Sequence, residues 1–484
     1  MPLSILVVGL ATLAQGVALL FNRSSRSRTA IEFLSSLGFL AAMATLAVGQ
    51  SADQSQIWFG LLEDQPLFRL PRAALFVAAL LLGRGVVATK ELPAKRKHEV
   101  LFLLSTLVML CDLLLLSRQM TLSIILLVCG SWLSLFLGGL AFRGRGEGEA
   151  VLKYWIQASL VMAGGFGAAT ALAVVAGGVH YDVISSFLHA QSIYSLSALL
   201  VVFALCLPFV MAAGLFPFHF AHVDRDQGMP WPVVVTLSVI WQGTVTLALW
   251  KMGVEVFGKA RPGEVSEGLR TLQLCGLSGG FWLALVALTQ ENSKRLFSAL
   301  VGAQWSAILV AGALPTVLSA SSITYAFASV FVWTSLLGFN WGRFQESAGG
   351  ENLKDVYGAA RTFRSSGLLL LLALASPLCI PGLPGFPMAL NLLAAMMEQK
   401  SLFFLAAEVL LVATLSLISI RVGTDLLFRQ RASSSTNTAP LVLFRYGALE
   451  WLSLAVAIVA LAALGFLWHR VFALLFETAK VFLK

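Results

Sequence analysis

The sequence predicts an all-α integral membrane protein with about fourteen transmembrane helices, arranged as two inverted five-helix repeats in which helices 7 and 12 are broken. Two observations predict the membrane class. Hydrophobic residues make up 58% of the 484 residues and charged residues only 12%, whereas soluble domains average about 25% charged residues. Apolar stretches of roughly 20 residues, each long enough to cross about 30 Å of hydrocarbon, recur along the whole chain. A third observation, the placement of the prolines, predicts the breaks.

Fourteen apolar stretches account for most of the chain. In order they are residues 2–21, 29–49, 72–90, 99–117, 120–142, 151–178, 194–216, 231–257, 270–289, 296–317, 320–341, 366–398, 401–428 and 441–468. The first lacks a basic segment before it and a small-residue cleavage site after it, so it is expected to be retained as a helix. No stretch has the composition of a soluble catalytic domain.

The spans fall into four groups. Residues 1–97 hold three N-terminal helices, residues 98–257 the first repeat with helices 4–8, residues 258–430 the second repeat with helices 9–13, and residues 431–484 helix 14 and a tail. The tail intersperses apolar residues with Glu477 and Lys480. This pattern predicts a short amphipathic helix at the membrane interface or against a partner; a frayed chain end is the alternative.

Basic residues mark one side of the expected bundle. The net charge is +9, but the lysines and arginines lie in short loops between spans, so they indicate topology rather than nucleic-acid binding. They cluster after odd-numbered spans, as Lys90, Arg96 and Lys97 do after span 3, whereas Glu63 and Asp64 follow span 2. The positive-inside rule places both chain ends on the outer face of a bacterial-type inner membrane. Only the loop 218–230 departs from this pattern, because it is not basic.

Prolines interrupt two of the spans. Span 7 contains Pro208 and Pro217, and span 12 contains Pro377, Pro381 and Pro384. Proline lacks a backbone donor and clashes with the preceding turn, so neither span is expected to be a continuous helix. Broken backbone at membrane depth is tolerated only inside protein or beside a water-filled cavity, and two breaks five spans apart indicate an internal repeat with a site in each half. Simple kinking is the alternative.

Several motifs, in order along residues 98–430, resemble the antiporter-like subunits of respiratory complex I and of Mrp antiporters. The resemblance is greatest to NADH-quinone oxidoreductase subunit N, the type of mitochondrial subunit 2. The matching stretches are Ala150-Val151-Leu152-Lys153-Tyr154, Pro217-Phe218-His219-Phe220, Asn292-Ser293-Lys294-Arg295-Leu296, Asn352-Leu353-Lys354-Asp355 and Ile380-Pro381 with Gly385-Phe386. The resemblance implies that protons move along buried ionisable residues, where burial and neighbouring charges set the charge state of a lysine.

The same resemblance nominates a polar axis, made of Lys153, His219, Gln242, Lys251 and Gln304. Lys153 is either the cytoplasmic start of a proton path or a lysine that snorkels at a helix start. His219 belongs to a matched motif, although a surface histidine is the simpler interpretation. Lys251 occupies a place where the family often has arginine, and interfacial snorkelling is favoured for it.

The ionisable residues that the family uses are substituted here. The glutamate of span 5 falls at 129–131, which includes Ser131, and the lysines of spans 7 and 12 fall at Ala212 and Ala389. The span 8 lysine is replaced by Gln242, and the polar residue of span 10, often histidine, by Gln304. Alanine cannot bind a proton and glutamine can only form hydrogen bonds. No buried charge is therefore expected beside either break.

The resemblance implies a membrane-arm subunit of a complex I-like, proton-translocating assembly, and the substitutions predict a degenerate or inactive channel. The alternatives are an active proton or cation translocator that uses an altered path, or the membrane module of an Mrp-like or inorganic-carbon uptake complex. The chain has no nucleotide-binding motif, and its five cysteines lack the paired spacing of zinc or iron–sulfur sites. No catalytic, cofactor or metal site is expected in this chain. The expected partners are other membrane subunits and lipid, with any quinone bound mainly by those subunits.

Overall fold

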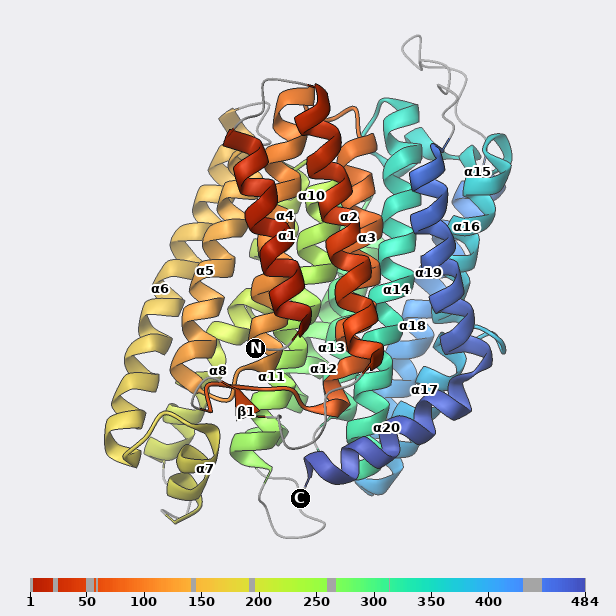
Figure 1. The fold of residues 1–484 in the computed structure, drawn as a ribbon. Helices are drawn as coiled ribbons and strands as arrows, with labels where there is room; N and C mark the ends of the chain where they lie inside the picture. Colours follow the sequence, from red (N-terminus) through yellow and green to blue (C-terminus); the bar gives the residue numbers. More distant parts are fainter. Residues whose placement is uncertain are drawn as a thin grey trace.

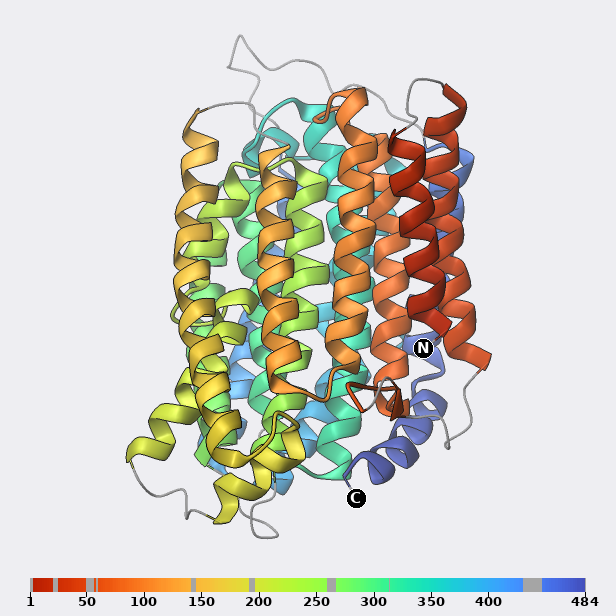
Figure 2. The same cartoon turned by 60° about the vertical axis from the view of Figure 1, so that its left-hand side comes forward.

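The computed structural model is a bundle of long, roughly antiparallel helices (Figures 1 and 2). It describes residues 3–20, 25–48, 56–57, 60–140, 145–190, 196–258, 267–312, 314–429 and 446–483. Within these ranges ten helices are long and apolar enough to cross a membrane, and three shorter apolar helices accompany them. The predicted class, an all-α multi-pass membrane protein, is confirmed. The count of fourteen spans and the inverted relation of the repeats stay predictions.

The described segments up to residue 258 contain the following elements. They are α1 Leu3–Leu20, α2 Ser25–Val48, β1 Gln56–Ile57, β2 Leu62–Glu63, η2 Pro66–Phe68, α3 Arg69–Ala88, α4 Ala94–Leu116, α5 Met120–Gly139, α6 Arg145–Ala176, α7 Tyr181–Ala190, α8 Leu196–Ala213, α9 His219–Gln227, α10 Trp231–Val235, η3 Thr236–Trp241 and α11 Gln242–Phe257. Of these, η3 is a π-helical stretch between α10 and α11. The two short strands pair antiparallel.

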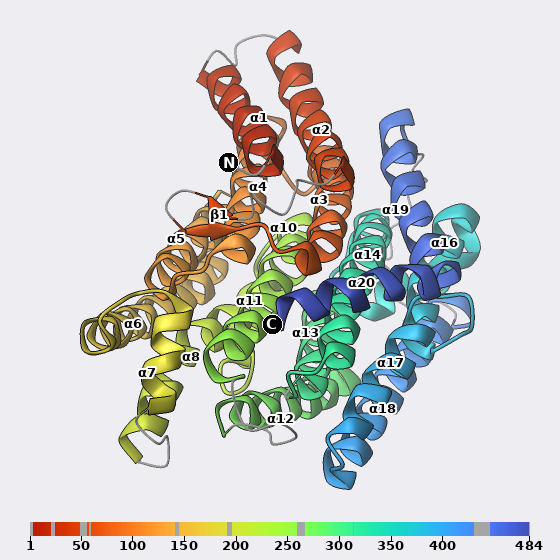
Figure 3. The same cartoon turned by 60° about the horizontal axis from the view of Figure 1, so that its bottom comes forward.

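The described segments from residue 267 onward come next. They contain α12 Glu267–Thr289, α13 Ser293–Ala311, α14 Val317–Ala348, η4 Leu353–Val356, α15 Ala359–Thr362, α16 Arg364–Ala375, η5 Ser376–Leu378, α17 Gly385–Glu398, α18 Leu402–Leu427, α19 Ala448–Phe466 and α20 Trp468–Phe482. The predicted tail helix is confirmed as α20. It lies across one end of the bundle and packs against α14 (Figure 3).

The two ends of the bundle differ in charge. Residues 89–93, 290–292 and 349–363 connect helices at one end, which we call the basic face, and α20 and the two strands lie at the other, which we call the tail face (Figure 1). Lys90 and Arg96 lie at the basic face, and Glu63 lies at the tail face. Both chain ends point toward the tail face (Figures 1 and 2). The alternation of basic and acidic loops therefore corresponds to two opposite faces.

The centre of the bundle is formed by two helical segments that are buried over nearly their whole length. They are residues 231–257, which include η3 and α11, and α14. In contrast, most residues of α6 and α18 are at least partly exposed on the outside of the bundle, where apolar side chains meet lipid rather than protein. Polar residues on α11 and α14 therefore lie in the interior.

The first break lies later in the chain than the first proline indicated. Span 7 was predicted to be broken at Pro208 and Pro217, but Pro208 lies within α8, which continues to Ala213. Its ring packs against Gly165 of α6, where any Cβ would clash with it, and this close approach accommodates the proline inside the helix. The chain turns instead at Gly214, whose φ of 68° favours glycine, and Pro217 follows in that turn.

The second break lies where the prolines predicted it. Pro377 forms part of η5, and Pro381 and Pro384 lie in the turn that separates η5 from α17. Gly382 in this turn has a φ of 91°. Ser416 on α18 donates a hydrogen bond of 2.8 Å to the carbonyl of Pro377. The freed backbone of the break is thus satisfied by a neighbouring helix, as buried irregular backbone requires.

Candidate functional site

A histidine and a glutamine lie directly on the first break. His222 Nε2 is 2.7 Å from the carbonyl oxygen of Met211, and Nδ1 is 2.8 Å from Nε2 of Gln242. A Cβ at Gly214 would be only 2.8 Å from Cγ of His222, so glycine lets the ring pack against the turn. The carbonyl can only accept and the amide donates, so this geometry fits a neutral imidazole with its proton on Nε2.

A buried ion pair lies on the same short helix. Arg225 and Asp226 of α9 have no exposed surface, and Arg225 Nε donates a 2.8 Å hydrogen bond to Oδ1 of Asp226. The other carboxylate oxygen accepts hydrogen bonds from Ser238 (3.0 Å) and Ser298 (2.7 Å). The guanidinium lies 4.6 Å from the centre of the Tyr154 ring. Two charges in this low-dielectric environment are tolerated because each has a partner.

These residues correct two expectations from the sequence. Residues 218–230 were expected to be a loop, but His219–Gln227 form α9, which packs against α6 and α13. No buried charge was expected beside a break, yet Arg225 and Asp226 are buried, and His222 of the same helix touches Gly214. The reason is that a short polar helix resembles a solvated loop until neighbouring helices cover it. The sequence contains one indication of a helix here. Arg225 and Asp226 follow His222 by three and four residues, which places them on one face of a helix.

Lys251 lies further along α11, toward the tail face. Its Nζ donates hydrogen bonds to the carbonyls of Leu115 (2.8 Å) and Ser117 (3.0 Å) at the end of α4, and Glu255 lies 3.9 Å away. Gln65 donates a 3.0 Å hydrogen bond to Glu255. The lysine is only 1% exposed, so the favoured interfacial snorkelling is wrong. It cannot snorkel because the end of α4 supplies carbonyl acceptors within the protein.

The middle of the second repeat has different chemistry. Gln304 of α13 accepts a 2.9 Å hydrogen bond from Nε1 of Trp333 on α14, and this neutral pair occupies the buried centre of the bundle. Ala389, where the resembled family has lysine, is buried on α17. One buried carboxyl of this half, Glu408 on α18, has no hydrogen-bond partner among the described residues.

The remaining predicted residues lie apart from this interior. Lys153 is on the outer side of α6, with 69% of its side chain exposed, and pairs with Glu149 at 2.6 Å. His219 is buried against the ring of Phe216, with Phe220 and Trp282 beside it. The substituted positions Ser131 and Ala212 are both buried, on α5 and α8. Gln242 and Lys251 thus lie on the same helix, α11, whereas Lys153 lies on α6 and His219 on α9.

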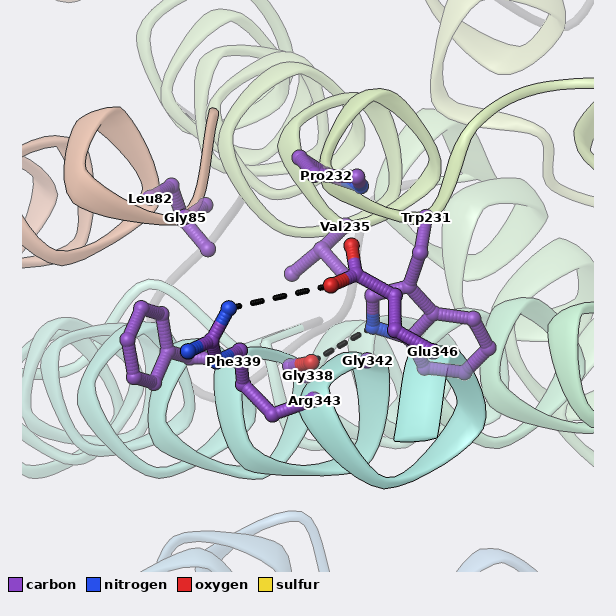
Figure 4. A pocket seen from close by; sticks show the side chains of 10 residues that line it. All are labelled: Leu82, Gly85, Trp231, Pro232, Val235, Gly338, Phe339, Gly342, Arg343 and Glu346. Atoms are coloured by element: carbon purple, nitrogen blue, oxygen red, sulfur yellow. Dashed lines mark hydrogen bonds and ion pairs between the residues drawn. The ribbon is translucent and has the colours of Figure 1, made fainter. Parts of the chain in front are cut away.

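A small cavity lies near the basic face between α3, α10 and α14 (Figure 4). Its volume is about 20 Å³, which is enough for one water molecule. Arg343, Glu346 and Trp231 all line it. Arg343 and Glu346 are 3.7 Å apart, and Trp231 donates a 2.5 Å hydrogen bond to the carbonyl of Gly338. The sequence indicated only a basic loop here, because the cavity depends on how three helices meet.

Comparison with known proteins shows that this chain is similar to subunits N of NADH-quinone oxidoreductases. No known protein-family profile matches the chain. NADH-quinone oxidoreductase subunit N of Francisella tularensis subsp. holarctica is 27% identical over 240 residues, which cover 48% of this chain and 48% of that protein. The corresponding protein of Anaeromyxobacter sp. is 27% identical over 405 residues, or 78% of this chain and 76% of that protein. For relatives such as those of Francisella and Chlorobium chlorochromatii, the chain spans about half of their length.

Solved structures share the fold at lower identity. A chain of the Mrp complex from Dietzia sp. DQ12-45-1b superposes with a TM-score of 0.82 at 15% identity, covering 100% of this chain and 98% of that chain. A chain of respiratory complex I from Thermus thermophilus with bound aureothin gives 0.76 at 20% identity, covering 97% and 98%. The resemblance predicted from the motifs is therefore confirmed: the homologues are subunits N, and the fold is that of complex I and Mrp membrane subunits.

Proposed function

We propose that this chain is a membrane-arm subunit of a complex I-like, proton-translocating assembly. Its partners are other multi-pass membrane subunits, and any quinone is bound by them. The lysine relay of the family is degenerate in this chain, and the polar route that remains lies in the first repeat. The observation that carries the proposal is the pair of His222 and Gln242 on the break at Gly214, in a fold shared with proton-pump subunits.

Residues along one central segment support this route. Ser238, which contacts the buried Arg225–Asp226 pair through Asp226, lies four residues before Gln242, and Lys251 lies about 13 Å beyond Gln242 at 1.5 Å per residue. Polar groups therefore follow η3 and α11 from near the basic face toward the tail face. Histidine changes charge near neutral pH more readily than other side chains, so His222 is the proton carrier in this route. The centre of the second repeat, with Gln304 and Ala389, lacks the family's ionisable groups.

The division into residues 98–257 and 258–430 is part of the same proposal, with the halves related as inverted repeats. The basic face is cytoplasmic and both termini are on the outer face, because positive loops stay inside. Alkaline phosphatase fused after Lys484 tests this orientation. The fusion is expected to be active, since the enzyme folds only outside the cytoplasm, and an inactive but expressed fusion would reverse the orientation.

The assembly is tested by isolating the tagged chain from native membranes in mild detergent. We expect it to elute with other multi-pass subunits in a complex that reduces a quinone and acidifies or alkalises vesicles when reconstituted. A complex that exchanges cations without quinone reduction would favour the Mrp-like alternative. A chain that elutes alone, or that moves protons without partners, would refute the proposed role.

A further inference from the structure

Glu408 is a carboxylic acid buried among apolar groups. Glu408 has no exposed surface, and neither of its carboxyl oxygens has a hydrogen-bond partner among the described residues. Leu411, one helical turn further along α18, faces Gly280 of α12, and Ser306 of α13 also lies beside Gly280. Residues three apart share a helix face, so Glu408 lies on the face of α18 that packs against α12 and α13. Three apolar helices enclose it rather than lipid or solvent.

Charged groups on the neighbouring elements do not pair with it. The elements that pack on α18 are α12, α13, α15, α16, α17 and η5, and their charged or titratable residues are Glu267, Arg270, Cys275, Lys294, Arg295, Arg361, Arg364 and Glu398. Lys294 and Arg295 pair with Glu351 and Asp224 at the basic face, and Glu398 accepts a hydrogen bond from Thr316. On α18 itself, Arg421 donates a hydrogen bond to the carbonyl of Leu288 and Asp425 pairs with Arg429, both more than three turns away. Among the described residues no ion pair reaches Glu408.

An unpaired carboxylate is not tolerated in such a place. Burial of an ionised carboxyl without a partner is so unfavourable that the group takes up a proton instead. A metal ion does not fit, since no cluster of three or more His, Cys, Asp or Glu side chains exists in the described part of the chain, and hard cations need several oxygen ligands. The ligand that suits one isolated carboxyl is therefore a proton.

A hydrogen-bond donor for the ionised form lies at the same depth. Asn391 of α17 is 5% exposed, and its Nδ2 has no acceptor among the described residues. The helices α17 and α18 are neighbours joined by the short turn 399–401, and Asn391 and Glu408 are nearly the same number of residues from it. Antiparallel helices place such residues at similar height, because each residue adds 1.5 Å.

We propose that Glu408 is a proton-binding site of the second repeat, neutral in the resting protein and enclosed by α12, α13 and α18. This inference goes beyond the proposed function, which places the proton route in the first repeat. It gives the second half one protonatable group on α18, in place of the lysine that is absent at Ala389 on α17. The proton binds to a carboxyl oxygen, and its release leaves a carboxylate at about the height of Asn391 on the neighbouring helix.

Infrared spectroscopy of the purified full-length chain in detergent tests the proposal. At pH 6.5, where ordinary carboxyls are ionised, the wild type minus Glu408→Gln difference is expected to show the carbonyl band of about one protonated acid per chain, shifted by deuterium exchange. Glu398→Gln is the matched control, because that carboxyl is exposed at the end of α17, and its difference should contain only carboxylate bands. If Glu408→Gln does not fold, Glu408→Asp serves instead, since it keeps an acid but moves the band.

A difference spectrum with carboxylate bands and no protonated-acid band at pH 6.5 would overturn the inference. The measurement needs only the folded chain and no partner subunit. Its failure therefore leaves the proposed assembly role untouched, and a chain that elutes alone leaves the infrared result standing.

Discussion

The two breaks of this chain have similar prolines but different surroundings. At the first break, the turn at Gly214 contacts His222 and Gln242, and α9 adds the buried Arg225–Asp226 pair. At the second break, the turn at Gly382 is followed by α17 with alanine at 389, and the bundle centre holds the neutral Gln304–Trp333 pair. A shared backbone break therefore does not imply shared chemistry, because the side chains that cover the break determine what it can do.

The largest effect is expected from removing the carboxylate of the buried ion pair. Asp226→Leu leaves Arg225 buried without its partner, and breaking a buried pair in this way costs about 3–5 kcal/mol. The double variant Arg225→Met/Asp226→Leu removes both charges and should recover most of this loss. Thermal unfolding followed by size-exclusion chromatography measures both. Equal losses in the single and double variants would show that the cost does not come from leaving Arg225 without a partner.

The second-largest effect on stability is expected at the two turns, which contain Gly214 and Gly382. Gly214→Ala places a side chain at positive φ and 2.8 Å from the His222 ring, which should destabilise the protein by about 2–4 kcal/mol. Gly382→Ala has similar backbone strain but meets Phe466 at 3.2 Å, so about 1–2 kcal/mol is expected. The same unfolding assay compares them. A larger loss at Gly382 would mean that the second turn is the more tightly packed one.

Proton flux should depend on the first repeat more than on the centre of the second. Gln242→Leu removes the hydrogen bond to Nδ1 of His222, worth about 1–1.5 kcal/mol, so proton transport by the reconstituted assembly should fall about tenfold. Gln304→Leu is the matched control. It removes the acceptor of Trp333 and is expected to lower stability by about 1–3 kcal/mol with little change in flux. Reversed effects would place the route in the second repeat.

The smallest effect is expected at the basic face, outside the membrane spans. Lys354 donates hydrogen bonds to Glu291, which lowers the pKa of the glutamate and raises the pKa of the lysine. The glutamate's contribution to stability is therefore lost as the pH falls through its lowered pKa. The lysine's contribution is present below its unfolded pKa and is lost as the pH rises through its raised pKa.

Lys354→Met should make the melting temperature depend less on pH at both the acid and the alkaline end. The change should be small, because exposed ion pairs contribute little to stability. Lys480→Met serves as the control, since its partner Glu477 lies at the opposite face. Identical acid and alkaline limbs in the wild type and Lys354→Met would show that the pair makes no contribution.

The sequence by itself determined the membrane class, the approximate helices, the second break and the tail helix. Apolar length, proline and charged loops act locally, so each can be recognised without knowing what lies nearby. The substitutions inferred at Ala212, Gln242, Gln304 and Ala389 rest on the motifs that surround them and stay predictions.

Only the tertiary structure decided which polar side chains lie inside. The polar segment 218–230 resembled a loop, yet α6 and α13 cover it as α9 and bury Arg225 and Asp226. Lys153 matched a motif but faces outward, whereas Lys251 is enclosed because α4 ends beside it. Burial is a property of neighbours that are distant in sequence, and in a chain this apolar every helix has the composition of a buried one. The packing of the helices, rather than their composition, therefore selects the residues that can carry a proton.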